Sequence, residues 1–116
     1  MRIVIALSTA AAALLAVSAL ADDLPEGVGQ TLTCGHVYSL RSEELRQAGD
    51  DGGATELSYM SDALLQQARV LLEGSGYTAA EIDDIDMSHA LTTGFNYGAG
   101  MGEQMLADCL AAWDSP

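Results

Sequence analysis

The chain has 116 residues, with 4 basic residues, all of them arginine, against 17 Asp and Glu residues and a formal net charge of −13. Nucleic acids and anionic membrane surfaces are bound largely through basic groups, so this composition excludes both as expected targets. If charge guides the choice of a protein partner, we expect that partner to be basic.

The first 21 residues have the pattern of a secretory signal peptide. Arg2 precedes an uncharged Ala- and Leu-rich run that ends at Ala19-Leu20-Ala21, and Asp22 restores charge. No basic stop-transfer cluster follows the run, and no cysteine stands at the cleavage point to carry a lipid. We therefore predict a signal peptide at residues 1–21, a single helical domain at 22–116, no membrane association after cleavage, and a periplasmic or secreted location in a Gram-negative bacterium.

Removal of residues 1–21 takes away one arginine and no acid, so the formal charge falls from −13 to −14. The mature chain then holds two cysteines, Cys34 and Cys109, near its two ends. Exported proteins meet an oxidising environment, and these cysteines lack the Cys-x-x-Cys spacing of redox pairs. We predict a structural disulfide between them.

Two helices are expected in the first half of the mature chain. Apolar residues recur at three and four spacing from about Cys34 to Ala48, and Gly49 follows as a stop signal. Residues 50–53, Asp-Asp-Gly-Gly, are typical of a turn. The second stripe is the clearest and runs from Leu57 to Leu72, with Thr55 or Ser58 as candidate caps and Gly74-Ser75-Gly76 at its end.

Two more helical blocks follow. Thr78-Ala79-Ala80-Glu81 has the pattern of a capping box, and Asp83, Asp84 and Asp86 crowd the start of the same helix, where negative charge is favoured. A final stripe spans residues 101–113. Because no segment alternates with period two, the predicted fold class is all-α, a small bundle of three to four helices closed by one disulfide.

The glycine-rich segment between the last two blocks allows two interpretations. It is either a loop or an at least partly helical stretch, and we favour the second. On a helix, Ala90, Gly94, Gly98 and Gly102 form a stripe without large side chains against which another helix packs. Whether that groove packs inside the monomer or across a dimer stays open. A packed groove predicts that Gly98→Leu is destabilising and that Gly100→Ala is neutral or stabilising.

No motif predicts a catalytic residue, a cofactor or a metal site. The glycines lack the Gly-Lys pair of a phosphate-binding loop, and from Asp84 onward the residues do not match a calcium-binding loop. Asp86 and His89 could share zinc, with His36 as the only other imidazole, and Met101 with Met105 could hold copper, but core packing is the commoner role of such residues. The sequence alone does not show whether His36 and His89 meet.

In general features the chain resembles the small periplasmic acid-stress chaperones, which are signal-bearing, helical, of similar size and closed by one disulfide. The likeness extends to the Thr33-Cys34 start, although the cysteines of that family lie closer together than Cys34 and Cys109. Three hypotheses follow: a non-enzymatic protein-interaction module, of inhibitor or immunity type; an acid-stress chaperone; and a copper or zinc carrier or small enzyme. We expect the first.

Overall fold

The computed structural model describes residues 24–114, so the predicted signal peptide lies outside the described residues. The described chain is helical and contains no strand. Its elements are α2 (Val28–Gln47), α3 (Asp51–Gly74), α4 (Ala79–Asn96), a π-helical turn η1 (Tyr97–Met101) and α5 (Gly102–Asp114). The last three form one long, bent helix. The prediction of an all-α bundle of three to four helices is confirmed.

Two predicted boundaries were wrong, both at helix starts. α2 begins at Val28, six residues before Cys34, because Gly27 supplies a left-handed entry and its carbonyl accepts the Thr31 amide. α3 begins at Asp51 rather than near Leu57, so the expected turn at residues 50–53 is mostly helix. Asp50 is the cap: its carboxylate accepts the Gly53 amide at 3.0 Å, which offsets the low helix propensity of the two glycines.

Two other local signals are confirmed. The Thr78 hydroxyl accepts the Glu81 amide at 3.2 Å, and the Glu81 carboxylate accepts the Thr78 amide at 2.9 Å. These reciprocal bonds complete the capping box that opens α4. Gly49, with a φ of 86°, follows the end of α2 and turns the chain toward α3.

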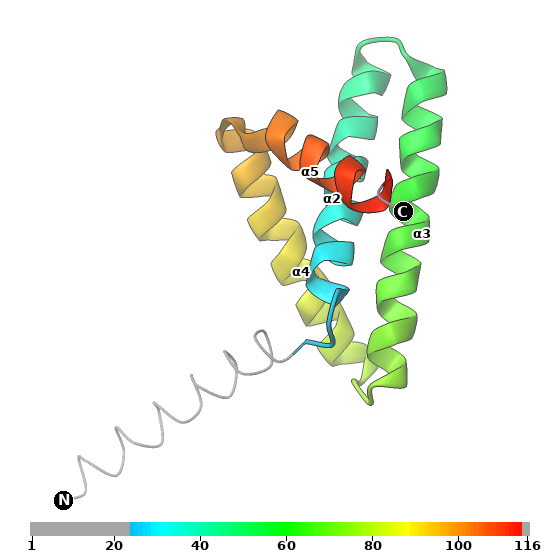
Figure 1. Ribbon diagram of the computed structural model, residues 1–116, viewed down its shortest axis with the longest axis vertical. Helices are drawn as coiled ribbons and strands as arrows, with labels where there is room; N and C mark the ends of the chain where they lie inside the picture. Colours follow the sequence, from blue (N-terminus) through cyan, green and yellow to red (C-terminus); the bar gives the residue numbers. More distant parts are fainter. Residues whose placement is uncertain (1–23, 115–116) are drawn as a thin grey trace, which may run out of the picture.

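α2 is the central helix of the bundle. α3 runs antiparallel along one side, α4 lies on the other side, and α5 folds back across α2 toward α3 (Figure 1). One core cluster joins α2 to the end of α3 and the start of α4, and the second joins α2 to the first half of α3 and to α5. In the second cluster α5 therefore takes the position beside α2 and α3 that α4 holds in the first.

α2 and α3 approach each other closely through small residues. A Cβ added at Gly35 would lie 2.7 Å from a methyl of Leu65, so the α3 side chain packs directly over the α2 backbone. Beside it, the Ser61 hydroxyl donates to the Gly35 carbonyl at 2.7 Å, and farther along, the Ser42 hydroxyl donates to the Ala54 carbonyl at 2.7 Å. These buried hydroxyls are satisfied by backbone carbonyls of the facing helix, which fixes the pairing of α2 with α3.

The bend between α4 and α5 is centred on Gly100. Its φ of 102° lies in a region that side chains rarely adopt, so the helix direction changes at this residue. α5 then returns to α2, where Cys109 forms a disulfide with Cys34. The predicted pairing is confirmed. No helix within residues 24–114 is long and apolar enough to cross a membrane.

Candidate functional site

The disulfide is a structural element and not an exposed redox centre. Both cysteines are buried in the second core cluster among side chains of α2, α3 and α5. Reactive cysteines are accessible and have nearby groups that stabilise a thiolate. Cys34 and Cys109 therefore hold α5 against α2 and offer no surface to a redox partner.

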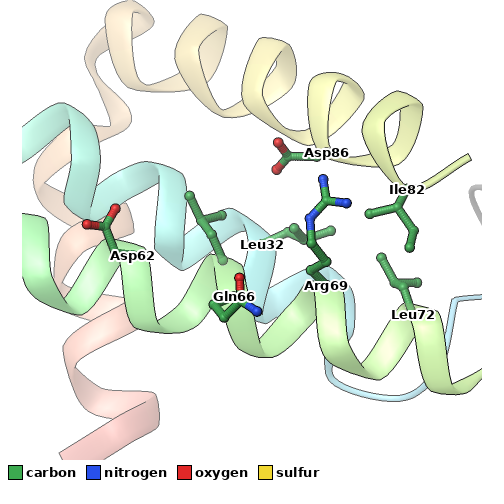
Figure 2. A pocket seen from close by; sticks show the side chains of 8 residues that line it. Leu32, Asp62, Gln66, Arg69, Leu72, Ile82 and Asp86 are labelled. Atoms are coloured by element: carbon green, nitrogen blue, oxygen red, sulfur yellow. The ribbon is translucent and has the colours of Figure 1, made fainter. Parts of the chain in front are cut away.

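A pocket lies between α3 and α4, with α2 as its floor (Figure 2). Its volume is about 320 Å³, and it is lined by Leu32, Asp62, Leu65, Gln66, Arg69, Leu72, Ile82 and Asp86. Two of its three charged groups already have partners, since Arg69 donates to Asp83 at 2.7 Å and Asp86 lies 2.8 Å from His36 Nε2. The pocket therefore presents no convergent set of unpaired groups for a ligand.

The two histidines have separate partners. His36 of α2 pairs with Asp86 of α4, whereas His89 Nδ1 donates to the Ile85 carbonyl at 3.0 Å in its own helix. Asp86 and His89 thus do not act as a pair, as a shared zinc site would require. Within residues 24–114, no three His, Cys, Asp or Glu side chains are grouped so that they could hold a metal.

A second pocket, of about 270 Å³, lies beside His89 and contains Met105. The rest of its lining is uncharged and mostly hydroxyl-bearing: Thr33, Ser88, Thr92, Thr93 and Asn96. Met101, the other half of the methionine pair considered for copper, is half-exposed and does not line this pocket. Of the two methionines, only Met105 therefore lines the pocket beside His89.

The corner between α4 and α5 is held to α2 by polar contacts. The Tyr97 hydroxyl donates to the Glu44 carboxylate, and Arg41 donates to Glu103 at 3.0 Å. Burial, followed by the hydrogen bond to Glu44 and its negative charge, raises the pKa of Tyr97 above its ordinary value. The ring of Tyr97 also covers Gly102, where an added Cβ would come within 3.0 Å of it. These contacts position α5 against α2.

The most unusual surface runs along the outward side of α4 and continues into η1. We call it the α4 face and define it as Met87, Leu91, Gly94 and Phe95 of α4 with Gly98 of η1. Its three large side chains are 59%, 67% and 77% exposed, in chain order. They recur at every fourth position and so lie along one side of the helix.

The inward side of the same segment is polar. His89 and the buried Thr93 lie toward the rest of the bundle, so the usual amphipathic pattern is inverted in the second half of α4. Residues 87–102 contain no Asp, Glu, Lys or Arg. A contiguous apolar surface of this kind on a strongly charged protein is typical of a binding site.

The predicted glycine groove does not pack within the described chain. A Cβ added at Gly94 or Gly98 would meet nothing within 4 Å, and Gly102 lies beyond the bend, under Tyr97. Ala90, the first residue of the predicted groove, is partly buried. The expected contrast between Gly98 and Gly100 is therefore reversed, because Gly98 faces open space and Gly100 is the residue with positive φ. The close helix approach occurs instead at Gly35.

The sequence contained a signal for the α4 face that periodicity alone did not resolve. Met87, Leu91 and Phe95 are spaced like a core stripe, and so are Ile82, Ile85 and His89 on the opposite side. A helix with two apolar stripes either is buried on both sides or exposes one of them. The absence of charge from 87 to 102 favoured burial, and the structure shows exposure.

Comparison of the chain with models of protein families, with curated proteins and with solved structures found no match.

Proposed function

We propose that this protein is an exported, non-enzymatic interaction module that binds a basic protein partner. The observation that carries the proposal is the inverted second half of α4, which presents large apolar side chains to solvent and polar ones to the bundle. Leaving Met87, Leu91 and Phe95 exposed forgoes the stabilisation that burial of such side chains provides, about 1.5 to 3 kcal/mol each. Covering them with a partner recovers part of it.

The charge distribution supports a basic partner. All three arginines of residues 24–114 donate to carboxylates within 3.0 Å: Arg41 to Glu103, Arg46 to Glu43 and Arg69 to Asp83. The carboxylates of residues 24–114 far outnumber these three arginines. A basic partner is attracted to such a surface over long range and forms ion pairs at the edge of the contact.

The test is reconstitution with an identified partner. Tagged mature protein is cross-linked in periplasmic and secreted fractions of the organism that encodes it, in parallel with the tag alone, and proteins enriched only by the tagged protein are purified and titrated against it. We expect a basic protein that binds at defined stoichiometry and loses affinity as salt is raised. Partners that are neutral or acidic, or no reconstituted complex at all, would refute the proposal.

A second candidate function, acid-stress chaperone, is favoured by how the helices are tied together. Arg41–Glu103 joins α2 to α5, Arg69–Asp83 joins α3 to α4, and His36–Asp86 joins α2 to α4. Each pair needs a charged carboxylate, and acid protonates carboxylates, so acid weakens all of these ties at once. Loosened helices then expose the two core clusters to client proteins.

Light scattering from an aggregating client at pH 3 tests the chaperone function. Suppression by the wild type at pH 3 and not at pH 7 supports it. Equal scattering with protein and with buffer removes it and leaves the interaction module alone.

A further inference from the structure

We infer that the α4 face is the docking site for a basic amphipathic helix of the partner. This inference rests on the proposed function and names the surface and the kind of segment that it binds. Three properties of the face lead to it: the shape of its backbone groove, its length, and the charges around it.

The shape of the face fits a helix. Gly94 precedes Phe95 and Gly98 follows it, and a Cβ added at either glycine would meet nothing within 4 Å. Without side chains at these two positions, a second helix can approach the backbone closely and set its own apolar residues beside Leu91 and Phe95. Amphipathic helices bind grooves in this way, with anchors one turn apart.

The length of the face matches a short helical segment. From Met87 to Gly98 the face spans about three turns, or roughly 17 Å at 1.5 Å per residue. A partner helix of about three to four turns covers it. The face ends at the bend of Gly100, where α5 turns back toward α2.

The charges at the amino-terminal end of the face favour a basic helix over a second copy of this chain. Asp84 is exposed and lies one turn before Met87 on the same side of α4, next to Asp83, which already binds Arg69. Basic residues at one end of the partner helix would pair with Asp84. A second copy instead brings another strongly acidic chain against the first, and its arginines already donate to its own carboxylates.

The experiment uses two 18-residue amphipathic peptides as probes, one built from Leu and Lys and the other from Leu and Glu in the same pattern. Each is titrated by calorimetry into the mature protein at physiological salt. Two double variants are compared with the wild type: Leu91→Gln/Phe95→Gln on the face, and Tyr59→Gln/Val70→Gln on α3 as a control. Tyr59 and Val70 are 79% and 54% exposed, so the control removes similar apolar surface elsewhere.

We expect the Leu/Lys peptide to bind the wild type and the α3 variant within a factor of two of each other, and the face variant at least tenfold more weakly. Gly98→Leu, which fills the groove without meeting any atom of the chain, should also weaken binding at least tenfold while the helical content stays unchanged. Because its helical content is measured as well, Gly98→Leu separates loss of docking from loss of folding.

The other outcomes overturn different statements. Equal binding of the Leu/Lys peptide to wild type and face variant overturns the α4 face as the site while the proposed function stands. Equal binding of the Leu/Glu peptide overturns the basic partner and with it the proposed function. A wild-type dimer by sedimentation that becomes monomeric in the face variant overturns the inference in favour of a second copy.

Discussion

Two segments of this chain have similar compositions and opposite environments. Residues 27–40 of the α2 region and residues 87–102 of the α4 region each lack Asp, Glu, Lys and Arg, and each contains one histidine and several glycines. The first is packed by α3, α4 and α5, and its side chains include Val28, Val37 and Tyr38, which are fully buried. The second exposes Met87, Leu91 and Phe95.

The difference follows from position in the bundle. α2 is central and contacts α3, α4 and α5 (Figure 1). α4 lies at the edge, and beside its second half the space against α2 and α3 is filled by α5. An uncharged helical segment is therefore compatible with burial but does not ensure it, because the number of neighbouring helices decides how many sides are covered.

The disulfide joins α5 to α2, and of the changes considered its removal should lower the free energy of unfolding the most. Cys34 and Cys109 are 75 residues apart, and on the chain-entropy model a crosslink of that span stabilises by about 4.5 kcal/mol. We expect Cys34→Ala/Cys109→Ala to lose an amount of that order in urea unfolding. Reduced wild type should behave like the variant. A loss below about 1 kcal/mol would show that α5 covers α2 without the bond.

Truncation of one leucine in each segment compares the two environments directly. Leu32 is buried in the first core cluster, so Leu32→Ala should lower the free energy of unfolding by about 3 kcal/mol. Leu91 is exposed, so Leu91→Ala should change it by less than about 0.5 kcal/mol. Urea melts of the purified monomer measure both. Similar losses would mean that the α4 face is covered in solution.

The bend that carries the chain away from α4 depends on one glycine. Gly100→Ala places a side chain at a φ of 102° and should cost about 1 to 2 kcal/mol. Gly98→Ala adds a methyl group in open space and should be neutral or slightly stabilising. Thermal melts of both variants beside wild type distinguish them. If Gly98→Ala were destabilising and Gly100→Ala were not, the groove at Gly98 would be packed against another helix after all.

The smallest effect is expected at the contact between Tyr97 and α2. Because the pKa of Tyr97 is raised in the folded state, the stability that its neutral form contributes is complete below the unfolded value of about 10 and is lost as pH rises through the folded pKa. Wild type should therefore lose stability relative to Tyr97→Phe between pH 9 and pH 12. Tyr59→Phe controls for alkaline effects elsewhere. If the stability of wild type and of Tyr97→Phe changed in parallel with pH, the pKa of Tyr97 would not be raised by folding.

Local chemistry in the sequence was enough to predict the helical class, the capping box at Thr78 and Glu81, the helix stop at Gly49 and the pairing of Cys34 with Cys109. Each of these depends on neighbouring residues or on there being only two cysteines to pair. The start of α3 was missed because the turn chemistry of Asp and Gly is the same chemistry that caps a helix.

Tertiary structure alone decided which glycines meet a neighbouring helix and which apolar stripe of α4 is covered. Gly35 packs under Leu65 and Gly98 faces open space, although both lie in uncharged, helix-forming segments. Periodicity specifies the sides of a helix but not the number of partners that it meets. That number depends on the return of α5 through the bend at Gly100, and this return leaves the α4 face without a covering helix among residues 24–114.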